Sequence, residues 1–428
     1  MAKKSLPQVE VTLEKIVGGG QSLGTLEDGR KVFVWGGLPD EKVVVQLTKK
    51  KSNYAEGFVT EVLTTSPERI EPKDSESYLS TSPWQIMSLE TENRYKAALI
   101  EEAFELHDMV LPNPIEVYSD GVEYGYRNKV EFSFWYEADT DSLSLAFFRR
   151  GTHGKLAVNG TSLASDAINT RAAEILKVLN DLHIDGRTLK TLLIRSDAQG
   201  NVAWQLYVKD QEFDAATLMT ALNDERGEVI YSNPQSPASV ITKRLTTAAK
   251  PLADTIFATP FHYATEGFFQ INLPVYEQAL RDMKEWIIEG QETVDLYSGV
   301  GSIGLTIGGD NVTLVELNEH AVREMERNIE ELGKKATAVL AASEQALDYI
   351  TGDKTIIVDP PRAGLHDDVV ERLLEQKPKR IIYLSCNPVT QARDVAKLTK
   401  EYGIRAHRGY NFFPHTPHIE HLVILDLY

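Results

Sequence analysis

The chain has 428 residues, enough for two or three domains, and its 42% hydrophobic and 25% charged residues are ordinary for a folded, soluble protein. Its single cysteine excludes an internal disulfide and an all-cysteine zinc or iron–sulfur site. No apolar run approaches the roughly 18 to 20 residues that span a bilayer, and the amino terminus lacks the apolar core of a signal peptide, so we expect a cytoplasmic protein without a membrane partner.

The formal net charge of −18 argues at first against a nucleic-acid partner. Its distribution changes that interpretation, because residues 1–72 hold 10 Lys+Arg and 10 Asp+Glu, and the acidic excess lies entirely in 73–428. Basic residues cluster at Lys3-Lys4 and at 49–51. A locally basic surface can bind phosphate on an acidic protein, because salt confines the field of distant charges to roughly 8 Å. A solvated hairpin is the alternative interpretation of 49–51.

Residues 8–66 alternate apolar and polar positions in short runs. Turn signals separate the runs at 18–20, Asp28-Gly29 and Pro39-Asp40. Short strands at this spacing predict a small closed β-barrel. A barrel of this size is a frequent nucleic-acid-binding module, and a purely structural β-domain is the alternative.

Residues 73–110 read as a polar loop that runs into an amphipathic helix, and 117–260 mix strands with a helix. This pattern predicts a central α+β domain, in which we find no self-sufficient catalytic motif. The predicted division of the chain is 1–68, 69–255 and 256–428.

From about residue 290 apolar strands alternate regularly with helices, which predicts a mostly parallel, doubly wound sheet. Ligands of such sheets bind at the carboxyl ends of the strands. Four chemically capable residues fall at or near these ends: Asp295, Glu316, Asp359 and Cys386.

The stretch 295–305 (DLYSGVGSIGL) is a strand, a glycine turn and a helix start. Gly299 and Gly301 allow the backbone to approach a ligand closely, and Glu316, 21 residues after Asp295, suits the hydroxyls of a ribose. A carboxylate at Asp295 would repel a pyrophosphate. The motif therefore favours S-adenosylmethionine, a cationic nucleoside, over a nicotinamide cofactor.

Two further strand ends carry reactive groups. In VDPPRAGL (358–365), two prolines stiffen the loop that holds Asp359 and Arg362, and a simple strand-terminating turn is the alternative. Cys386 precedes a helix with Pro388 in its first turn. Helix amides and dipole are expected to lower the pKa of its thiol. A buried structural cysteine is the alternative.

The stretch FFPHTPHIEHLVIL (412–425) contains His415, His418, Glu420 and His421. The histidine spacing hints at a metal, but Pro417 intervenes and a strand follows, so the imidazoles would not share a face and we predict no metal site. Glu420 is a candidate general base if it is partly desolvated, and an ordinary surface acid otherwise.

Six motifs occur in order between residues 267 and 420: GFFQIN, DLYSGVGSIGL, VELN, DPPRAGL, SCNP and FPHTPHIE. Together they resemble the S-adenosylmethionine-dependent RNA (uracil-C5)-methyltransferases. The N-terminal barrel resembles the OB-like TRAM domain of that family, and YGYRNKVEFSF in the middle is also similar to family sequence. The resemblance covers nearly the whole chain and implies that its third part is a Rossmann-like class I methyltransferase domain.

The resemblance implies roles for seven residues. Cys386 matches the catalytic nucleophile and Glu420 the base. The cofactor-binding positions are matched by Gln270, Tyr297, Ser302, Glu316 and Asp359. It also implies S-adenosylmethionine as cofactor and an RNA substrate, with 23S rRNA favoured over tRNA because of the barrel, and we expect a monomer.

Many members of this family hold a 4Fe–4S cluster through four cysteines, and this chain lacks those cysteines. Asp74, Ser80 and Pro83 stand where three cluster cysteines would fall, and Thr161 lies near the fourth. None of these can replace a thiolate. The chain is therefore expected to be a member without the iron–sulfur cluster. Ser298 likewise stands where relatives often have a cysteine.

The implied reaction needs these residue types. A thiolate of Cys386 adds to C6 of uracil, C5 becomes nucleophilic and takes the methyl group, and Glu420 removes the C5 proton, while Asp359 and Arg362 position cofactor and base. The uracil must be unpaired or flipped out to reach the thiol. Two alternatives stay open: an inactive RNA-binding protein with a methyltransferase fold, and an amino-group methylase, which would need no thiol and usually has an aromatic residue where Arg362 stands.

Overall fold

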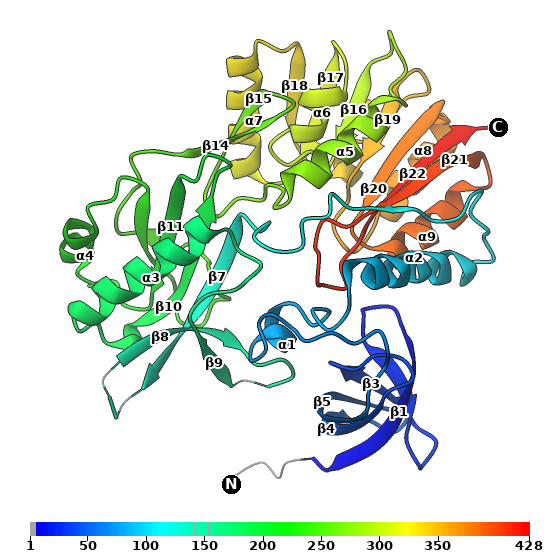
Figure 1. Ribbon diagram of the computed structural model, residues 1–428. Coiled ribbons are helices and arrows are strands. Elements are labelled where there is room, and N and C mark those ends of the chain that lie inside the picture. The colour runs from blue at the N-terminus through cyan, green and yellow to red at the C-terminus, as the bar shows by residue number, and fades with distance from the viewer. Residues whose placement is uncertain (1–5, 138, 141, 153) are drawn as a thin grey trace.

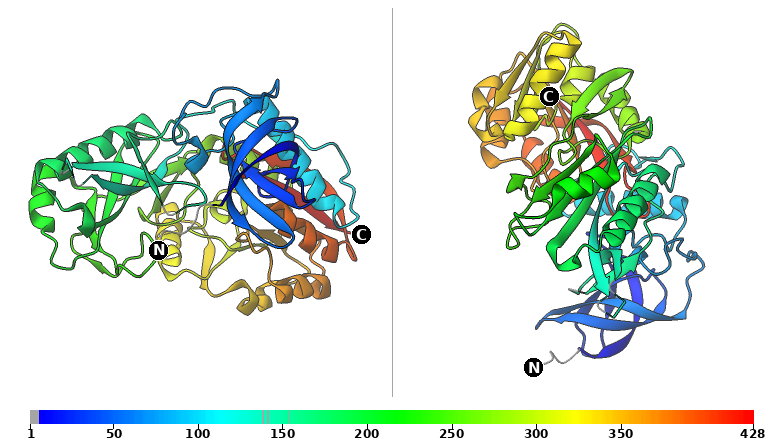
Figure 2. Two further views of the ribbon diagram at one scale, coloured as in Figure 1. Left: turned by 90° about the horizontal axis from the view of Figure 1, so that it is seen from below. Right: turned by 90° about the vertical axis from the view of Figure 1, so that its left-hand side faces the viewer.

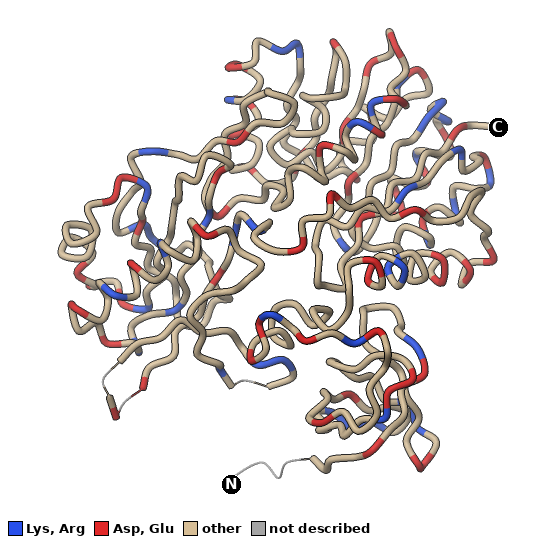
Figure 3. The backbone as a smooth tube through the Cα atoms, viewed as in Figure 1, with Lys and Arg blue, Asp and Glu red and all other residues tan. Residues whose placement is uncertain are grey.

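The structure, a computed structural model, describes residues 6–137, 139–140, 142–152 and 154–428. The predicted basic pair Lys3-Lys4 lies outside the described residues. The chain forms a small barrel, a central sheet and a larger C-terminal sheet, and the barrel projects from the other two (Figures 1 and 2). Basic and acidic positions are interspersed over all three parts (Figure 3).

The N-terminal part is a closed barrel in the order β1-β2-β3-β5-β4, which confirms the predicted barrel. Its strands are β1 (Gln8–Ile16), β2 (Ser22–Thr25), β3 (Lys31–Trp35), β4 (Lys42–Lys50) and β5 (Tyr54–Thr64). Alternate side chains such as Val32 and Val34 point inward and are fully buried, as the sequence alternation requires. Lys49 in the predicted basic cluster pairs with Glu56 at 2.7 Å.

The segment after the barrel contains α1 (Tyr78–Thr81), α2 (Leu89–Glu105) and β6 (Val117–Tyr118). The predicted division places it with the central domain, but the structure places α2 and β6 against the C-terminal sheet. β6 pairs in parallel with β21 (Tyr402–Tyr410). α2 buries Ile100, Ala103 and Phe104 in the core beneath that sheet. A local pattern reveals that a helix has an apolar face but not which sheet the face will cover.

The central domain is a seven-stranded sheet in the order β13-β12-β11-β10-β7-β8-β9. Its strands are β7 (Lys129–Glu137), β8 (Ser142–Phe148), β9 (Lys155–Val158), β10 (Leu189–Ser196), β11 (Val202–Val208), β12 (Gly227–Tyr231) and β13 (Lys243–Arg244). The helices are α3 (Asp166–Asp181) and α4 (Ala215–Leu222), and the 3₁₀ turn η1 (Gly186–Thr188) precedes β10. Apolar residues of both helices pack on one face of the sheet, which makes this an α+β domain.

The C-terminal sheet has eight strands in the order β18-β17-β16-β19-β20-β22-β21-β6, and the hairpin of β14 and β15 stands beside it. The strands are β14 (Leu252–Ile256), β15 (Thr259–Tyr263), β16 (Thr293–Leu296), β17 (Val312–Glu316), β18 (Ala336–Leu340), β19 (Thr355–Val358), β20 (Arg380–Ser385), β21 and β22 (Glu420–Leu427). The helices are α5 (Leu273–Lys284), α6 (Ser302–Ile307), α7 (Glu319–Leu332), α8 (Asp367–Gln376) and α9 (Pro388–Leu398), with the 3₁₀ turns η2 (Ser343–Gln345) and η3 (Leu347–Tyr349).

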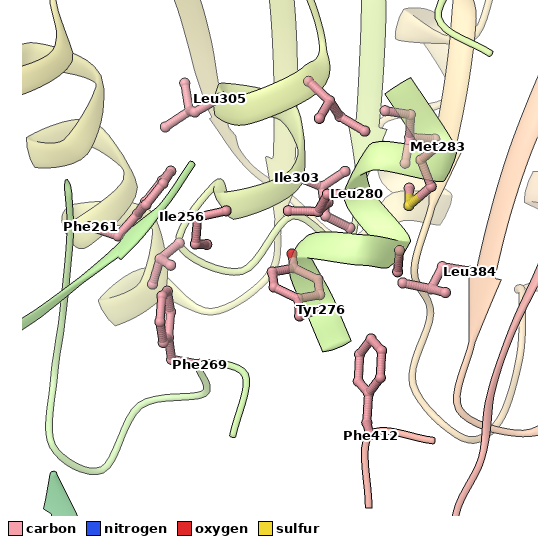
Figure 4. Close-up of a cluster of buried hydrophobic side chains, with 14 of the residues drawn as sticks. Ile256, Phe261, Phe269, Tyr276, Leu280, Met283, Ile303, Leu305, Leu384 and Phe412 are labelled. Atoms are coloured by element: carbon pink, nitrogen blue, oxygen red, sulfur yellow. The ribbon is translucent and has the colours of Figure 1, made fainter. Parts of the chain in front are cut away.

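Strands β16 to β20 are parallel, and antiparallel β22 lies between β20 and β21. The chain order reverses between β16 and β19, which creates the switch point where ligands of such sheets bind. A buried apolar cluster, to which Tyr276, Leu280 and Ile303 of α5 and α6 belong, covers one face of the sheet (Figure 4). Among the described residues, no helix combines the length and the apolar character needed to cross a bilayer.

Two of the four positions compared with cluster ligands lie together in the structure. The Asp74 carboxylate accepts hydrogen bonds from Thr161 Oγ1 and Ser162 N, both at 3.1 Å. Gln85 Nε2 also donates to Asp74 at 3.2 Å, and the Gln85 side chain is fully buried. Polar side chains thus join the segment after the barrel to the central domain at this place.

Candidate active site

A cavity of about 1310 Å³ lies at the edge of the C-terminal sheet where its parallel strands end. Its floor is formed where β16, β17, β19 and β20 end, and its far wall belongs to the central domain through Arg127 and Ile241. Six of the seven predicted site residues line it: Gln270, Tyr297, Glu316, Asp359, Cys386 and Glu420. The strand ends therefore bring together groups that lie up to 150 residues apart in sequence.

The seventh predicted residue, Ser302, is not among the residues that line the cavity. It begins α6, and its hydroxyl lies 2.8 Å from Tyr276 Oη. This contact joins α5 to α6, and the role of Ser302 in cofactor binding stays a prediction.

The turn after β16 has the conformation that a closely approaching ligand requires. Gly299 and Gly301 have φ values of 57° and 85°, and Tyr297 also has a positive φ, 64°. A positive φ is strained for tyrosine, which shows that surrounding contacts hold the turn in place. Glu316 faces the turn and accepts hydrogen bonds from Gly299 N at 2.9 Å and Asn318 N at 2.8 Å. Each carboxylate oxygen keeps a lone pair for a hydroxyl group.

Asp295 lies beneath this turn, fully buried, and does not line the cavity. Its Oδ2 accepts a hydrogen bond from Gly304 N at 2.9 Å, and burial raises the pKa of its carboxyl to about 8. The sequence-based argument that its charge would repel a pyrophosphate is therefore wrong, because the group is buried and protonated at neutral pH. The local pattern placed Asp295 at the strand end correctly, but side chains alternate across a strand and this one points under the turn.

The raised pKa of Asp295 predicts a pH-dependent stability. Because an unfolded aspartate titrates near 3.9 and the folded one near 8, the fold retains a proton that the unfolded chain releases, so stability is lost as pH rises between these values. We expect the free energy of unfolding to fall from pH 5 to pH 8 by about 1 kcal/mol per pH unit more in the wild type than in Asp295→Asn. Urea unfolding at several pH values measures this, with exposed Asp348→Asn as control. Parallel pH profiles for the wild type and Asp295→Asn would contradict it.

The predicted nucleophile and base meet through strand pairing. Cys386 follows the last residue of β20, and Glu420 is the first residue of β22. Ser385 pairs with His421 in the antiparallel ladder, so Cys386 and Glu420 stand one position beyond that pair, where both line the cavity. The Glu420 residue is only 6% exposed.

The loop 359–365 is held by hydrogen bonds from α9 and from the residue that caps its start. Asn387 Nδ2 donates to the carbonyl of Arg362 at 2.8 Å, and Leu365 N donates to the buried carboxylate of Asp394 at 2.8 Å. Gly364 has a φ of 81°, and a Cβ there would come within 2.6 Å of the Asp394 carboxylate. The loop therefore has one tight conformation, which places Asp359 and Arg362 at the cavity.

The pKa values of Asp359, Glu420 and Cys386 are all raised, in each case mainly by desolvation. Desolvation raises the pKa of Asp359 to about 7, and desolvation together with the charge of Asp359 raises the pKa of Glu420 well above its ordinary value. Desolvation and the two carboxylates raise the pKa of the Cys386 thiol to about 12. The expectation that helix amides lower this pKa is therefore wrong for the free protein, because burial and two acids outweigh the helix end and Arg362.

His418 and Arg362 form a second polar pair at the cavity. Arg362 Nη2 lies 3.1 Å from His418 Nδ1, and burial with the neighbouring guanidinium lowers the pKa of His418 to about 4. The imidazole is therefore neutral. The three histidines do not converge: His415 is fully buried, and His421 contacts Gln391 Oε1 at 2.7 Å. Among the described residues no cluster of His, Cys, Asp and Glu is arranged to hold a metal ion.

Phe268 and Arg127 are two of the cavity-lining residues that had no predicted role. Phe268, in GFFQIN, is 72% exposed, and Arg127, in YGYRNKV, reaches the cavity from the central domain. The Arg127 Nε is buried and has no hydrogen-bond partner among the described residues. Both residues belong to motifs on which the family resemblance rests, and this could have identified them as candidate site residues.

The strand order and the position of the cavity define the class of protein: the C-terminal domain is an α/β methyltransferase domain of class I, joined to an N-terminal barrel. Comparison with known proteins agrees. Residues 310–427 match the family described as tRNA (Uracil-5-)-methyltransferase, and residues 8–60 match the TRAM domain. The C-terminal part of the chain is thus similar to the RNA (uracil-5-)-methyltransferases, and its N-terminal part to TRAM domains.

Relatives match over nearly the full length. An uncharacterized RNA methyltransferase of Fusobacterium nucleatum is 27% identical over 98% of this chain and 95% of its own. Another, of Aquifex aeolicus, is 26% identical over 98% of both chains. The crystal structure of the Pyrococcus abyssi tRNA (uracil-54, C5)-methyltransferase in complex with S-adenosyl-L-homocysteine has a TM-score of 0.79 and 23% identity, covering 97% of this chain and 100% of that one. This structural match supports the fold.

Proposed function

We propose that this protein transfers a methyl group from S-adenosylmethionine to C5 of a uridine in RNA, through a covalent adduct between Cys386 and C6. The observation that carries the proposal is the convergence of Cys386, Glu420 and Asp359 with Glu316 and Gln270 in one cavity.

The residues around the switch point fit the cofactor. The turn with positive φ at Gly299 and Gly301 leaves room for a nucleoside, and Glu316 retains acceptors for two ribose hydroxyls. Gln270 and Tyr297 line the same part of the cavity. When bound there, S-adenosylmethionine supplies an electrophilic methyl group. This cofactor has no pyrophosphate, so the site needs no group that binds one.

In the mechanism that we propose, the Cys386 thiol first loses its proton, because its raised pKa keeps it protonated in the free protein. We assign Asp359, whose pKa is about 7, as the proton acceptor. The thiolate then forms the S–C6 bond, and the electron pair of the C5–C6 double bond moves toward O4. C5 then forms a bond to the methyl carbon, whose bond to the cofactor's sulfonium breaks, so that S-adenosylhomocysteine would be the leaving group. Glu420 must be ionised for the last step, because its raised pKa favours the neutral acid in the free protein. As the carboxylate it removes the C5 proton, the double bond forms again, and the S–C6 bond breaks.

The rest of the chain supplies RNA binding. A uridine must leave its stack to reach a thiol at the floor of a cavity. Arg127 and Phe268, a cation and an exposed aromatic ring at the cavity, are suited to phosphate and base contacts. We propose 23S rRNA as the favoured substrate because of the barrel, with tRNA as the competing class, and a monomer as the acting form.

The proposal is tested by methyl transfer from radiolabelled cofactor to RNA. Mass-spectrometric mapping of 5-methyluridine in rRNA and tRNA, from strains with and without the gene, identifies the substrate. We expect one or more rRNA uridines to lose the modification in the deletion strain. Loss confined to tRNA would reverse the preference. An absence of label in any RNA would favour the alternative, an inactive RNA-binding protein.

The role of Asp359 predicts a change in pH profile. Adduct formation in the wild type should rise with pH through about 7, because Asp359 must lose its proton before it can accept one. In Asp359→Asn this limb should vanish, and the rate at pH 7.5 should fall about 100-fold or more. The remaining activity should rise only at higher pH, as the thiol itself ionises. Trapping with 5-fluorouridine RNA measures the rate, and an unchanged profile would remove Asp359 from this role.

A further inference from the structure

α2 contains a fully buried ion pair that does not line the cavity. The side chains of Lys96 and Glu92 are both 0% exposed, and Lys96 Nζ lies 2.7 Å from Glu92 Oε1, one helical turn away. Burial lowers the pKa of Lys96, and Glu92 opposes that shift. Removing two charges from water costs several kcal/mol per ion. The attraction between the two charges offsets this cost only if their other polar atoms also form hydrogen bonds.

Every hydrogen-bonding group of the pair is used, and most contacts go to one distant loop. Lys96 Nζ donates to Asn411 Oδ1 at 2.6 Å and to the carbonyl of Phe413 at 3.2 Å, in addition to Glu92. Glu92 accepts from Asn411 Nδ2 at 2.9 Å and from His415 N at 2.8 Å. The ammonium thus has three acceptors for its three donors. The pair therefore forms hydrogen bonds with three alternate residues of the loop: Asn411, Phe413 and His415.

That loop, residues 411–419, connects β21 to β22 and ends at Glu420. Two of its side chains, Phe413 and His418, line the cavity together with Glu420. The carbonyls of Pro414 and His415 accept further hydrogen bonds, from Tyr126 Oη at 2.9 Å and Trp84 N at 3.1 Å. The loop is therefore held by hydrogen bonds from α2, from Trp84 before it and from Tyr126 after it.

We propose that Lys96 and Glu92 are positioning residues for the last chemical step, and that their contacts set Glu420 and His418 relative to Cys386. The inference rests on the proposed function. Apolar side chains of similar volume could stabilise the fold as well as this pair does, but only directional hydrogen bonds select one loop conformation. A shift of about 1 Å in a reacting group lowers a rate by about 100-fold, so a base at the end of a loop requires such a restraint.

The test uses the double variant Lys96→Met/Glu92→Met in the full-length protein. Because both charges are removed together, no unpaired charge is left buried, and the variant is expected to fold. With wild-type enzyme and with the variant, one measures kcat, KM for RNA, the fraction of enzyme held as covalent RNA adduct during turnover, and the isotope effect from deuterium at C5 of the target uridine. We expect kcat to fall about 10- to 100-fold with KM for RNA within about twofold.

The decisive readouts are the adduct fraction and the isotope effect. Both should rise in the variant, because removal of the C5 proton becomes slower than the steps before it. A merely structural role would lower the amount of active enzyme, so the adduct fraction would stay the same or fall and the isotope effect would not change. Lys177→Met/Asp181→Met is the matched control, because this exposed pair has the same spacing on α3, in the central domain.

Asn411→Ala is the second variant, for the case that the first does not fold. It leaves the ion pair in place and removes its side-chain link to the loop. A raised adduct fraction and isotope effect in either folded variant support the positioning role. Unchanged values in a folded variant overturn it. If wild-type protein transfers no methyl group to RNA, the proposed function fails instead, so the two failures are distinguishable.

Discussion

Replacing Cys386 by alanine is expected to abolish both methyl transfer and the covalent RNA adduct, a loss on the order of 10⁴-fold or more. No other cysteine exists in the chain, so no second thiol can replace Cys386 in the addition to C6. Radiolabelled methyl transfer and denaturing gels with 5-fluorouridine RNA measure the two effects. In that RNA the C5 fluorine cannot leave as a cation, so any adduct persists.

The control for this variant is cofactor binding. Cys386 is not among the predicted cofactor positions, so Cys386→Ala should bind S-adenosylmethionine and unfold at nearly the wild-type temperature. Cys386→Ser should be as inactive as the alanine variant, since a hydroxyl does not ionise at neutral pH. A serine variant with substantial turnover would refute nucleophilic addition by this residue.

Glu420→Gln is expected to behave differently, and the contrast separates the two roles. The amide has the shape of the carboxyl but cannot accept the C5 proton, so one methyl group should be transferred and the enzyme should then remain bound to its product. A denaturing gel should show an adduct approaching one equivalent with unmodified RNA, while turnover falls by about 10²- to 10⁴-fold. Because Glu420 is buried with a raised pKa, the neutral amide should not lower stability at neutral pH.

Two outcomes check the interpretation of Glu420→Gln. The double variant Cys386→Ala/Glu420→Gln should form no adduct, which shows that the trapped species depends on the thiol. Normal turnover of the single variant would assign proton removal to another group, and Asp359, in the same cavity wall, would be the next candidate.

Much of the site follows from periodicity and motif order. Apolar strands alternating with helices place Glu316, Asp359 and Cys386 at the carboxyl ends of parallel strands, and those ends meet at one edge of the sheet. Glu420 was identified from its family motif. The antiparallel register of β20 and β22 places Cys386 beside it. This pairing is long-range, and no local sequence pattern predicts it.

Two expectations changed for a common reason. Asp295 carries no charge facing the cavity, and the Cys386 thiol has a raised pKa. In each case the residue stands at the expected place in the chain. Its contacts, however, come from segments remote in sequence.

The amino-acid sequence alone predicts the barrel, the central α+β domain, the methyltransferase sheet and the candidates for the reacting side chains, because these depend on local alternation and on motifs of a few residues. The protonation states of those side chains depend on the tertiary structure, since desolvation and neighbouring charges set a pKa and both come from other parts of the chain. The same holds for Lys96 and Asn411, which are 315 residues apart and meet only after α2 has packed against the C-terminal sheet.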